Sequence, residues 1–150
     1  MANAYAVLDP SRVISGNFVK VLTADGSWLS NAKSAEATVE IGKEEIQRAG
    51  TRWVGHKATT LTGTGTVSGY LVTTELVEAI AQIADDAHGS YVTELRMKLD
   101  DPEAYGAYDI RLKGVQFDSI PLLSAEVGSI VEQELPFTFS GFEFINLITR

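Results

Sequence analysis

The residues best suited to chemistry in this 150-residue chain are carboxylates, because the sequence has no cysteine and only two histidines. Asp100, Asp101 and Glu103 lie close together, and hard cations such as Ca²⁺ take several oxygen ligands from one flexible loop. Their spacing does not match an EF-hand loop, and the intervening Pro102 is typical of a turn. We interpret this segment as a solvated hairpin tip rather than a calcium site.

A second pair of carboxylates, Glu132 and Glu134, is spaced two residues apart and therefore shares one face of a predicted strand. Paired carboxylates can hydrolyse glycosidic bonds, but in a strand these two would need acid partners across a cleft. We prefer to interpret them as part of a sheet surface that faces solvent, either on the outside of the protein or in an internal channel (lumen).

The glycine-rich segment from Gly63 to Gly69 superficially matches two nucleotide-binding and catalytic motifs. Its third glycine lies one place too late for a dinucleotide loop, and no helix follows directly. Ser68 does not lie midway between its glycines, as a nucleophile elbow requires. His56 and His88 belong to no catalytic or metal-binding motif. The sequence therefore predicts no cofactor, no bound metal and no enzymatic activity.

Composition predicts one globular domain over residues 1–150, since 45% of the residues are hydrophobic and 21% are charged. A chain of this length buries a core without disulfides or metals, and disulfides are excluded by the lack of cysteine. The longest uncharged stretch, Ala58 to Thr74, is mostly Thr and Gly, and no signal-peptide pattern precedes it. We expect neither membrane insertion by the chain nor classical secretion.

Charge divides the sequence into two unequal parts. Seven basic and six acidic residues up to Thr74 give +1, whereas five basic and fourteen acidic residues from Glu75 give −9, for a total of −8. An acidic surface repels nucleic-acid phosphates, while a slightly basic segment of one copy can be attracted to an acidic surface of another. Self-association is therefore electrostatically permitted.

Alternating apolar and polar residues predict a mainly β fold. The segment from Ala35 to Ile41 places small apolar residues on one face, and Gly65 and Gly69 predict a bulge or a close backbone approach. Pro136 predicts an edge or bulge position in the last strand. Residues 1–15 show no clean periodicity and contain a turn signal at Asp9, so we expect an irregular N-terminal arm. Hairpin-turn residues follow the first strand at 24–27. The predicted strands cover 18–22, 34–41, 64–72, 91–99, 108–113, 117–127 and 130–139.

One helix is predicted over residues 74–88, with Thr74 as its N-cap and Gly89 ending it. Seven or eight strands with one helix are typical of a β-sandwich or a small barrel with a helix against it. Between two predicted strands, Gly42 to Gly63 breaks every periodicity, and such long connections are usually functional. This connection has a net charge of about +2 and carries Trp53, an aromatic anchor candidate. Two interpretations of this connection remain open: a flexible surface loop, or a hairpin that the periodicity does not reveal.

Five short stretches, taken in order, resemble one family over roughly Arg12 to Ile145. They resemble the tail tube proteins of contractile-tailed phages, defective phage-like particles and R-type bacteriocins of Gram-positive bacteria. The stretches are Trp53-Val54-Gly55-His56-Lys57, Gly63-Thr64-Gly65-Thr66, Leu99-Asp100-Asp101-Pro102 with Tyr105-Gly106, Phe117-Asp118, and Leu135-Pro136-Phe137-Thr138-Phe139.

The resemblance implies a structural subunit with a β-sandwich and a flanking helix, not an enzyme. Six copies would form a ring around one continuous inner barrel, and rings would stack into a hollow conduit for DNA passage or membrane puncture. The implied partners are further copies of the chain and the tail sheath, baseplate and tape-measure proteins. DNA would pass without specific binding. The implied location is the tail of a virion or phage-like particle assembled in the host cytoplasm.

In the resemblance, residues 43–62 correspond to a long loop that reaches the neighbouring ring. The candidate inter-ring contacts are Lys43, Arg48, Arg52, Trp53 and Lys57. An acidic lumen would let nucleic acid slide without sticking. The candidate lumen carboxylates are Glu94, Asp109, Glu132 and Glu134.

Two other classes of protein remain as alternatives. A monomeric β-sandwich binding module would explain the loops but not the ordered series of motifs. An enzyme using Asp100, Asp101, Glu132 or Glu134 would need a deep pocket, which nothing in the sequence predicts.

Overall fold

The computed structural model describes residues 9–23, 32–70 and 75–148. Two 3-10 turns, η1 and η2, precede the first strand, and a third, η3, continues the single α-helix, α1. In chain order the elements are η1 Pro10–Arg12, η2 Gly16–Phe18, β1 Val19–Leu22, β2 Ala32–Ile46, β3 Gly55–Tyr70, α1 Glu75–Ile80, η3 Ala81–Ala84, β4 Val92–Leu99, β5 Tyr108–Phe117, β6 Glu132–Phe139 and β7 Gly141–Asn146.

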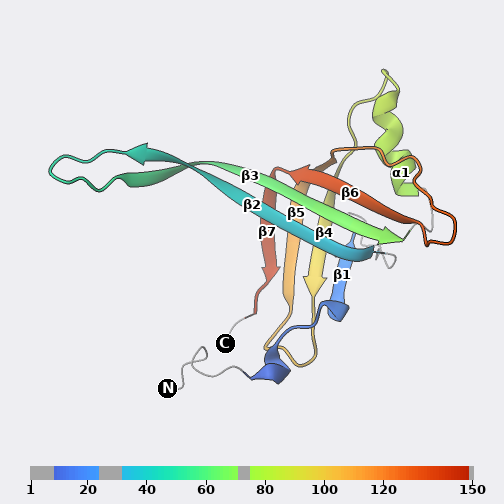
Figure 1. Ribbon diagram of the computed structural model, residues 1–150, viewed down its shortest axis with the longest axis horizontal. Helices are drawn as coiled ribbons and strands as arrows, with labels where there is room; N and C mark the ends of the chain where they lie inside the picture. Colours follow the sequence, from blue (N-terminus) through green and yellow to red (C-terminus); the bar gives the residue numbers. More distant parts are fainter. Residues whose placement is uncertain (1–8, 24–31, 71–74, 149–150) are drawn as a thin grey trace.

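All seven strands belong to one antiparallel sheet that folds into two layers crossing each other (Figure 1). The strand order is β1-β4-β5-β6-β3-β2, and β7 pairs with β5 beside that path. β5 joins the layers, because its residues from Asp109 to Lys113 pair with β7 and its last residues, Gln116 and Phe117, pair with β6.

The core lies between the two layers. Both layers contribute fully buried side chains, and small residues of β2 pack against them, as the alternation of Ala35 and Ala37 predicts. The buried cluster comprises Val67, Leu95, Leu112, Val115, Phe137 and Phe139. Apolar burial of this kind is the main force that holds two layers together. The predicted mainly β fold with a sandwich-like core is confirmed.

Two glycines of β3 let aromatic rings lie directly against the strand. Gly63 is paired with Phe139 and Gly65 with Phe137, and a Cβ at either glycine would collide with the ring of its partner. At Gly65 a Cβ would also strike the backbone carbonyl of Glu36. The predicted close approach at Gly65 is therefore confirmed, and its cause is the packing of phenylalanine rings over the strand.

Pro136 lies in β6 just past the point where its pairing with β5 ends, so one side of this residue behaves like the predicted edge position. The carbonyl of Pro136 accepts a hydrogen bond from the N–H of Asp118, just beyond the end of β5. Since the N–H and C=O of one strand residue point the same way, the missing donor of Pro136 faces the side where β5 has ended. The proline therefore interrupts no ladder hydrogen bond.

The predicted strand over 117–127 is wrong. β5 extends to Phe117, and residues 118–131 form no strand. Pro121 lies in the middle of this apolar run and cannot donate a ladder hydrogen bond, which weakens strand formation there. Conversely, β7 is absent from the predicted strands. Only Ser140 separates it from β6, although Ser-Gly is a recognised turn signal.

The helix is shorter than the predicted 74–88. α1 ends at Ile80 and continues only as η3, after which the Asp85 carboxylate accepts a hydrogen bond from the N–H of Ala87. Such a local side-chain turn competes with helical hydrogen bonding and ends the helix early. The predicted N-cap at Thr74 and the hairpin turn at 24–27 lie outside the described residues, as does the arm up to residue 8.

The connection predicted over residues 43–62 is a hairpin rather than a loop. β2 runs to Ile46 and β3 begins at Gly55, so only residues 47–54 lack strand structure. Figure 1 shows this hairpin projecting far beyond the two-layered body along the longest axis.

Candidate assembly surfaces

The projecting hairpin carries all five predicted inter-ring residues on exposed positions. Lys43 pairs with Ala58, next to Lys57, while Arg48, Arg52 and Trp53 lie in the segment that joins the strands. Trp53 is 79% exposed. A large aromatic side chain left in water on a projecting tip is a typical anchor for a partner. We call residues 43–57 the hairpin tip.

Two further apolar residues of the hairpin tip, Ile46 and Val54, are also exposed. Sequence reasoning missed both residues, because only the hairpin brings Ile46, at the end of β2, near Trp53 and Val54, which precede β3. Together with Trp53 they make the tip both apolar and, at a net charge of about +2, weakly basic.

The outward face of the layer formed by β2, β3 and β6 is acidic and rich in hydroxyl groups. The strand register aligns Glu36 with Thr66, and Ser68 with Glu134, so that rows of Glu and Thr or Ser side chains run across all three strands. The side chains of Ser34 and Ser68 form a hydrogen bond at 2.5 Å. On this face lie Ser34, Glu36, Thr38, Glu40, Thr62, Thr64, Thr66, Ser68, Glu132, Glu134 and Thr138. We call it the Glu/Thr face.

One cation lies beside the Glu/Thr face. Lys33 forms an ion pair with Glu132 at 3.2 Å, which raises the pKa of the lysine through the side-chain hydrogen bond and the charge of its partner. Both side chains are about half exposed, so this pair adds little stability. The net charge of the Glu/Thr face remains negative.

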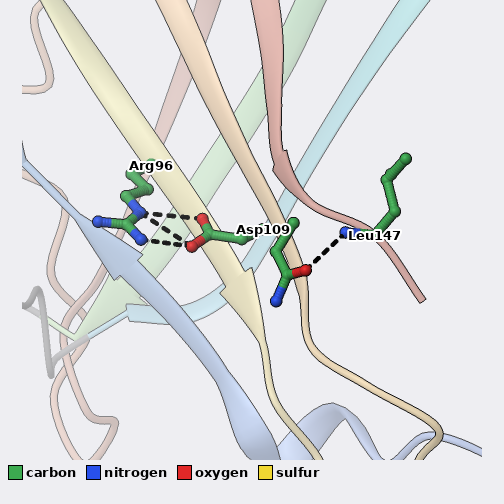
Figure 2. A network of polar contacts seen from close by, with 4 residues as sticks. Arg96, Asp109 and Leu147 are labelled. Atoms are coloured by element: carbon green, nitrogen blue, oxygen red, sulfur yellow. Dashed lines mark hydrogen bonds and ion pairs between the residues drawn. The ribbon is translucent and has the colours of Figure 1, made fainter. Parts of the chain in front are cut away.

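The outward face of the other layer has a different character, since its carboxylates are matched by arginine and lysine. Arg96 donates a bifurcated hydrogen bond from its single Nε–H to both carboxylate oxygens of Asp109, at 2.9 and 3.1 Å, and another from a terminal nitrogen (Figure 2). These contacts raise the pKa of Arg96. Figure 2 also shows the N–H of Leu147 donating to the side chain of Asn146 at 3.1 Å, at the end of β7.

Two further ion pairs complete this second face. Arg111 donates to Glu94 at 2.8 Å, and Lys113 pairs with Glu143 at 3.2 Å. Because each carboxylate here has a cationic partner across the strands, the face presents little uncompensated negative charge.

The four predicted lumen carboxylates are therefore divided between the two faces. Glu132 and Glu134 lie on the Glu/Thr face, whereas Glu94 and Asp109 lie on the ion-paired face. Asp109 is moreover only 2% exposed. Sequence reasoning did not single out Glu36 and Glu40 for this face, although the alternation of that strand marked both as polar-face residues.

The acidic tip at residues 100–103 is a structural turn. Asp101 is buried and accepts hydrogen bonds from the N–H groups of Ser15, at 2.8 Å, and Glu103, at 2.9 Å. These donors lower the pKa of the Asp101 carboxyl. Arg12 donates to the carbonyl of Glu103 at 2.7 Å. The tip therefore ties down the segment before β1, and across the described ranges no three His, Asp or Glu side chains gather as a metal site would require.

An exposed apolar segment covers residues 118–131, next to the start of β6. Leu122 and Leu123 are each 79% exposed, and Val127 is completely exposed. A hollow of about 130 Å³ lies between residues 121–124 and 131–134. Glu132 and Glu134 line the hollow and Lys33 pairs with Glu132, so the net charge beside the hollow is negative. We call residues 118–131, with this hollow, the apolar segment.

In the described part of the chain, no helix is both long and apolar enough to span a bilayer.

A two-layered antiparallel sheet with a projecting hairpin and a single short helix is the architecture of tail tube proteins, and the sequence agrees. The chain belongs to the phage tail tube protein family, whose family model matches residues 6–146. Among curated proteins it is 37% identical over 124 residues to the phage-like element PBSX protein XkdM of Bacillus subtilis strain 168, which covers 81% of this chain and 84% of that protein.

Two solved structures share the fold at low sequence identity. The sheath–tube complex of an extracellular contractile injection system, PVC, in the extended state matches with a TM-score of 0.70 and 13% identity, over 90% of this chain and 93% of the matched chain. The tube-terminating cap of the anti-feeding prophage matches with a TM-score of 0.72 and 13% identity, over 98% and 100%. The predicted family, the tail tube fold and the role as a structural tail tube subunit are confirmed.

Proposed function

We propose that six copies of this chain form a ring, and that rings stack into a hollow conduit for DNA passage or membrane puncture. The tube begins at a baseplate, is enclosed by a tail sheath and contains a tape-measure protein, and it assembles in the host cytoplasm. Support for sheath and baseplate partners comes from the similar proteins, because their solved assemblies include a sheath–tube complex and a baseplate.

The observation that carries this proposal is the open edge of β2. This strand of 15 residues ends the strand order, and no described strand pairs with its outer side. A long unpaired edge recruits another chain through its free N–H and C=O groups. In a ring the neighbouring copy pairs with that edge, so the sheets of all copies join around the axis and the edge disappears.

We further propose that the Glu/Thr face lines the conduit. Its carboxylates Glu36, Glu40, Glu132 and Glu134 repel phosphates, and its hydroxyl groups stay hydrated. At physiological salt the repulsion reaches only about 8 Å from the wall. This short-range repulsion keeps nucleic acid from binding the channel wall but does not exclude it from the channel. Glu94 and Asp109 are left out of the proposed lumen, because each is paired with an arginine on the other face.

The absence of cysteine provides a direct test of which face points inward. Single variants Glu36→Cys and Thr38→Cys are assembled into tubes and treated with a small maleimide or with a bulky polymer-linked one. A thiol in the lumen reacts with the small reagent but not with the bulky one. The matched control Glu143→Cys, on the ion-paired face, shows how a position outside the lumen reacts.

Two results would overturn the proposed lumen. The first is equal reaction of Glu36→Cys with both reagents in intact tubes, which would place it on the outer surface. The second is failure of the small reagent to react, which would place it in a contact between subunits. Labelling of the unassembled variants beforehand verifies that each thiol is reactive.

The assembly itself is tested by electron microscopy with light scattering across a concentration series, with and without added baseplates. Rings or hollow tubes are the expected result. A chain that stays monomeric even with baseplates would refute the tube and favour the monomeric binding module.

A further inference from the structure

We infer that the hairpin tip of one copy docks onto the apolar segment of a copy in the next ring, with Trp53 entering the hollow between residues 121–124 and 131–134. This inference rests on the proposed stacking of rings, and it names the surface that receives the hairpin.

The first argument is complementary chemistry. Trp53, Ile46 and Val54 make the tip apolar, and Leu122 and Leu123 are the exposed leucines that border the hollow. Each surface leaves large apolar side chains in water, and burial of such area drives association. Neither surface is covered by any described part of the same chain.

The second argument is charge. The hairpin tip has a net charge of about +2, with Arg48 and Arg52 flanking the turn. The apolar segment contains Asp118 and Glu126, and Glu132 and Glu134 line its hollow, where Lys33 neutralises part of the charge by pairing with Glu132. Opposite charge on the rims of two apolar surfaces speeds their encounter and fixes their register.

The third argument is size. A closed cavity of roughly 150 Å³ holds one benzene molecule. The hollow measures about 130 Å³, too small to enclose the two-ring indole of Trp53, but it opens to solvent and can receive the edge of that ring system. Trp53 is the most exposed aromatic side chain among the described residues. Aromatic anchors seated in pockets supply most of the affinity in typical interfaces.

The fourth argument is position. The hairpin tip and the apolar segment lie at opposite ends of the longest axis of the molecule (Figure 1). A copy therefore cannot satisfy its own tip, and copies that all point the same way satisfy one another in series. The contact is head-to-tail, and a head-to-tail contact that does not close on itself propagates without limit. Stacking of rings in one direction has this geometry.

The test is a disulfide between the two surfaces. Because the chain has no cysteine, the double variant Trp53→Cys with Leu122→Cys can form a bridge only between the introduced thiols. In oxidised tubes each copy forms two disulfides, one from position 53 to a copy in one neighbouring ring and one from position 122 to a copy in the other. We expect a ladder of covalent chains on a denaturing gel that extends beyond six copies. The two single variants, and Trp53→Cys with Val13→Cys, serve as controls.

Each outcome is decisive. A ladder that stops at six copies would place the contact within one ring and overturn the docking between rings. Tubes that form normally but give no more cross-linking than the Val13 control would also overturn it, and the proposed tube would stand. If the unmodified chain forms no tubes even with baseplates, the proposed function fails, and this inference fails with it.

A second measurement guards against distortion of the hollow by the new thiols. Trp53→Ala is expected to shorten tubes or lower their yield at least tenfold without changing the stability of the monomer. Val13→Ala, which removes a 58% exposed apolar side chain from the segment before β1, is the control and is expected to leave tube yield unchanged. Equal effects of the two variants would contradict a specific role for Trp53.

Discussion

The packing of phenylalanine rings over two glycines gives the most quantitative prediction. All three atoms nearest to a Cβ at Gly63 belong to the ring of Phe139. Overpacking a core by one methyl group costs about 1–3 kcal/mol. Removing a glycine also restricts the unfolded chain, which returns about 0.4–1 kcal/mol. We expect Gly63→Ala to lower the free energy of unfolding by about 1–2 kcal/mol.

A double-mutant cycle separates the clash from other effects. Phe139→Leu removes the ring that the new methyl group strikes, so Gly63→Ala should cost much less in that background, with a coupling of about 0.5–3 kcal/mol. Gly65→Ala provides the contrast. Its Cβ meets the ring of Phe137 but also the backbone carbonyl of Glu36, which no side-chain change removes. We therefore expect Phe137→Leu to rescue Gly65→Ala less completely.

The assay is urea unfolding of the unassembled chain, with the denaturant slope compared between variants to verify that the unfolded surface is unchanged. Gly89→Ala is the control, because no atom lies within 4 Å of its Cβ position and its φ is not positive. That variant is expected to be neutral or slightly stabilising. The reasoning is refuted if Gly63→Ala behaves like Gly89→Ala, or if both phenylalanine replacements rescue equally.

Two further predictions concern the ionised groups. Asp109→Ala should lower the free energy of unfolding by about 1.5–3 kcal/mol, because a buried carboxylate that accepts hydrogen bonds from two nitrogens of Arg96 is lost. Glu143→Ala, which breaks a half-exposed pair, should cost less than about 1 kcal/mol, and equal losses in urea unfolding would contradict this. Since hydrogen bonding lowers the folded-state pKa of Asp101, its contribution is complete above the unfolded pKa near 3.9 and disappears as pH falls through the lower folded value. The amide resonance of Ser15 should therefore move only below about pH 4, and a titration near pH 6 would contradict the assignment.

Sequence patterns identified those strands that face the core. The alternation from Ala35 to Val39 and that of the last predicted strand correctly separate inward from outward residues, because one face of each packs against the opposite layer. Ile41, at the end of the first pattern, is instead 53% exposed. The ordered family motifs indicated that these strands form a β-sandwich with a flanking helix.

The hairpin tip could not be recognised as strand, for a physical reason. A register shift between Gly42 and Lys43 changes the phase of the alternation. Beyond that point the two strands leave the body, so neither face touches the core and neither needs to be apolar. A period of two is visible only where one face is buried, and projecting hairpins lack that signal.

The lumen candidates show a second limit. The polar positions Glu94 and Asp109 look alike in sequence to Glu132 and Glu134. They differ through their partners: the register of β4 and β5 brings Arg96 and Arg111 beside the first pair, whereas in the second pair Lys33 contacts Glu132 alone. Strand pairing, rather than local pattern, decides which carboxylates remain uncompensated.

The proposed tube is tested most directly by a cryo-electron microscopy reconstruction of tubes assembled from this chain. We expect rings of six copies whose sheets join through the outer edge of β2, with the Glu/Thr face around the channel. A tube whose channel is lined by the ion-paired face, or in which the edge of β2 stays unpaired, would contradict the proposal.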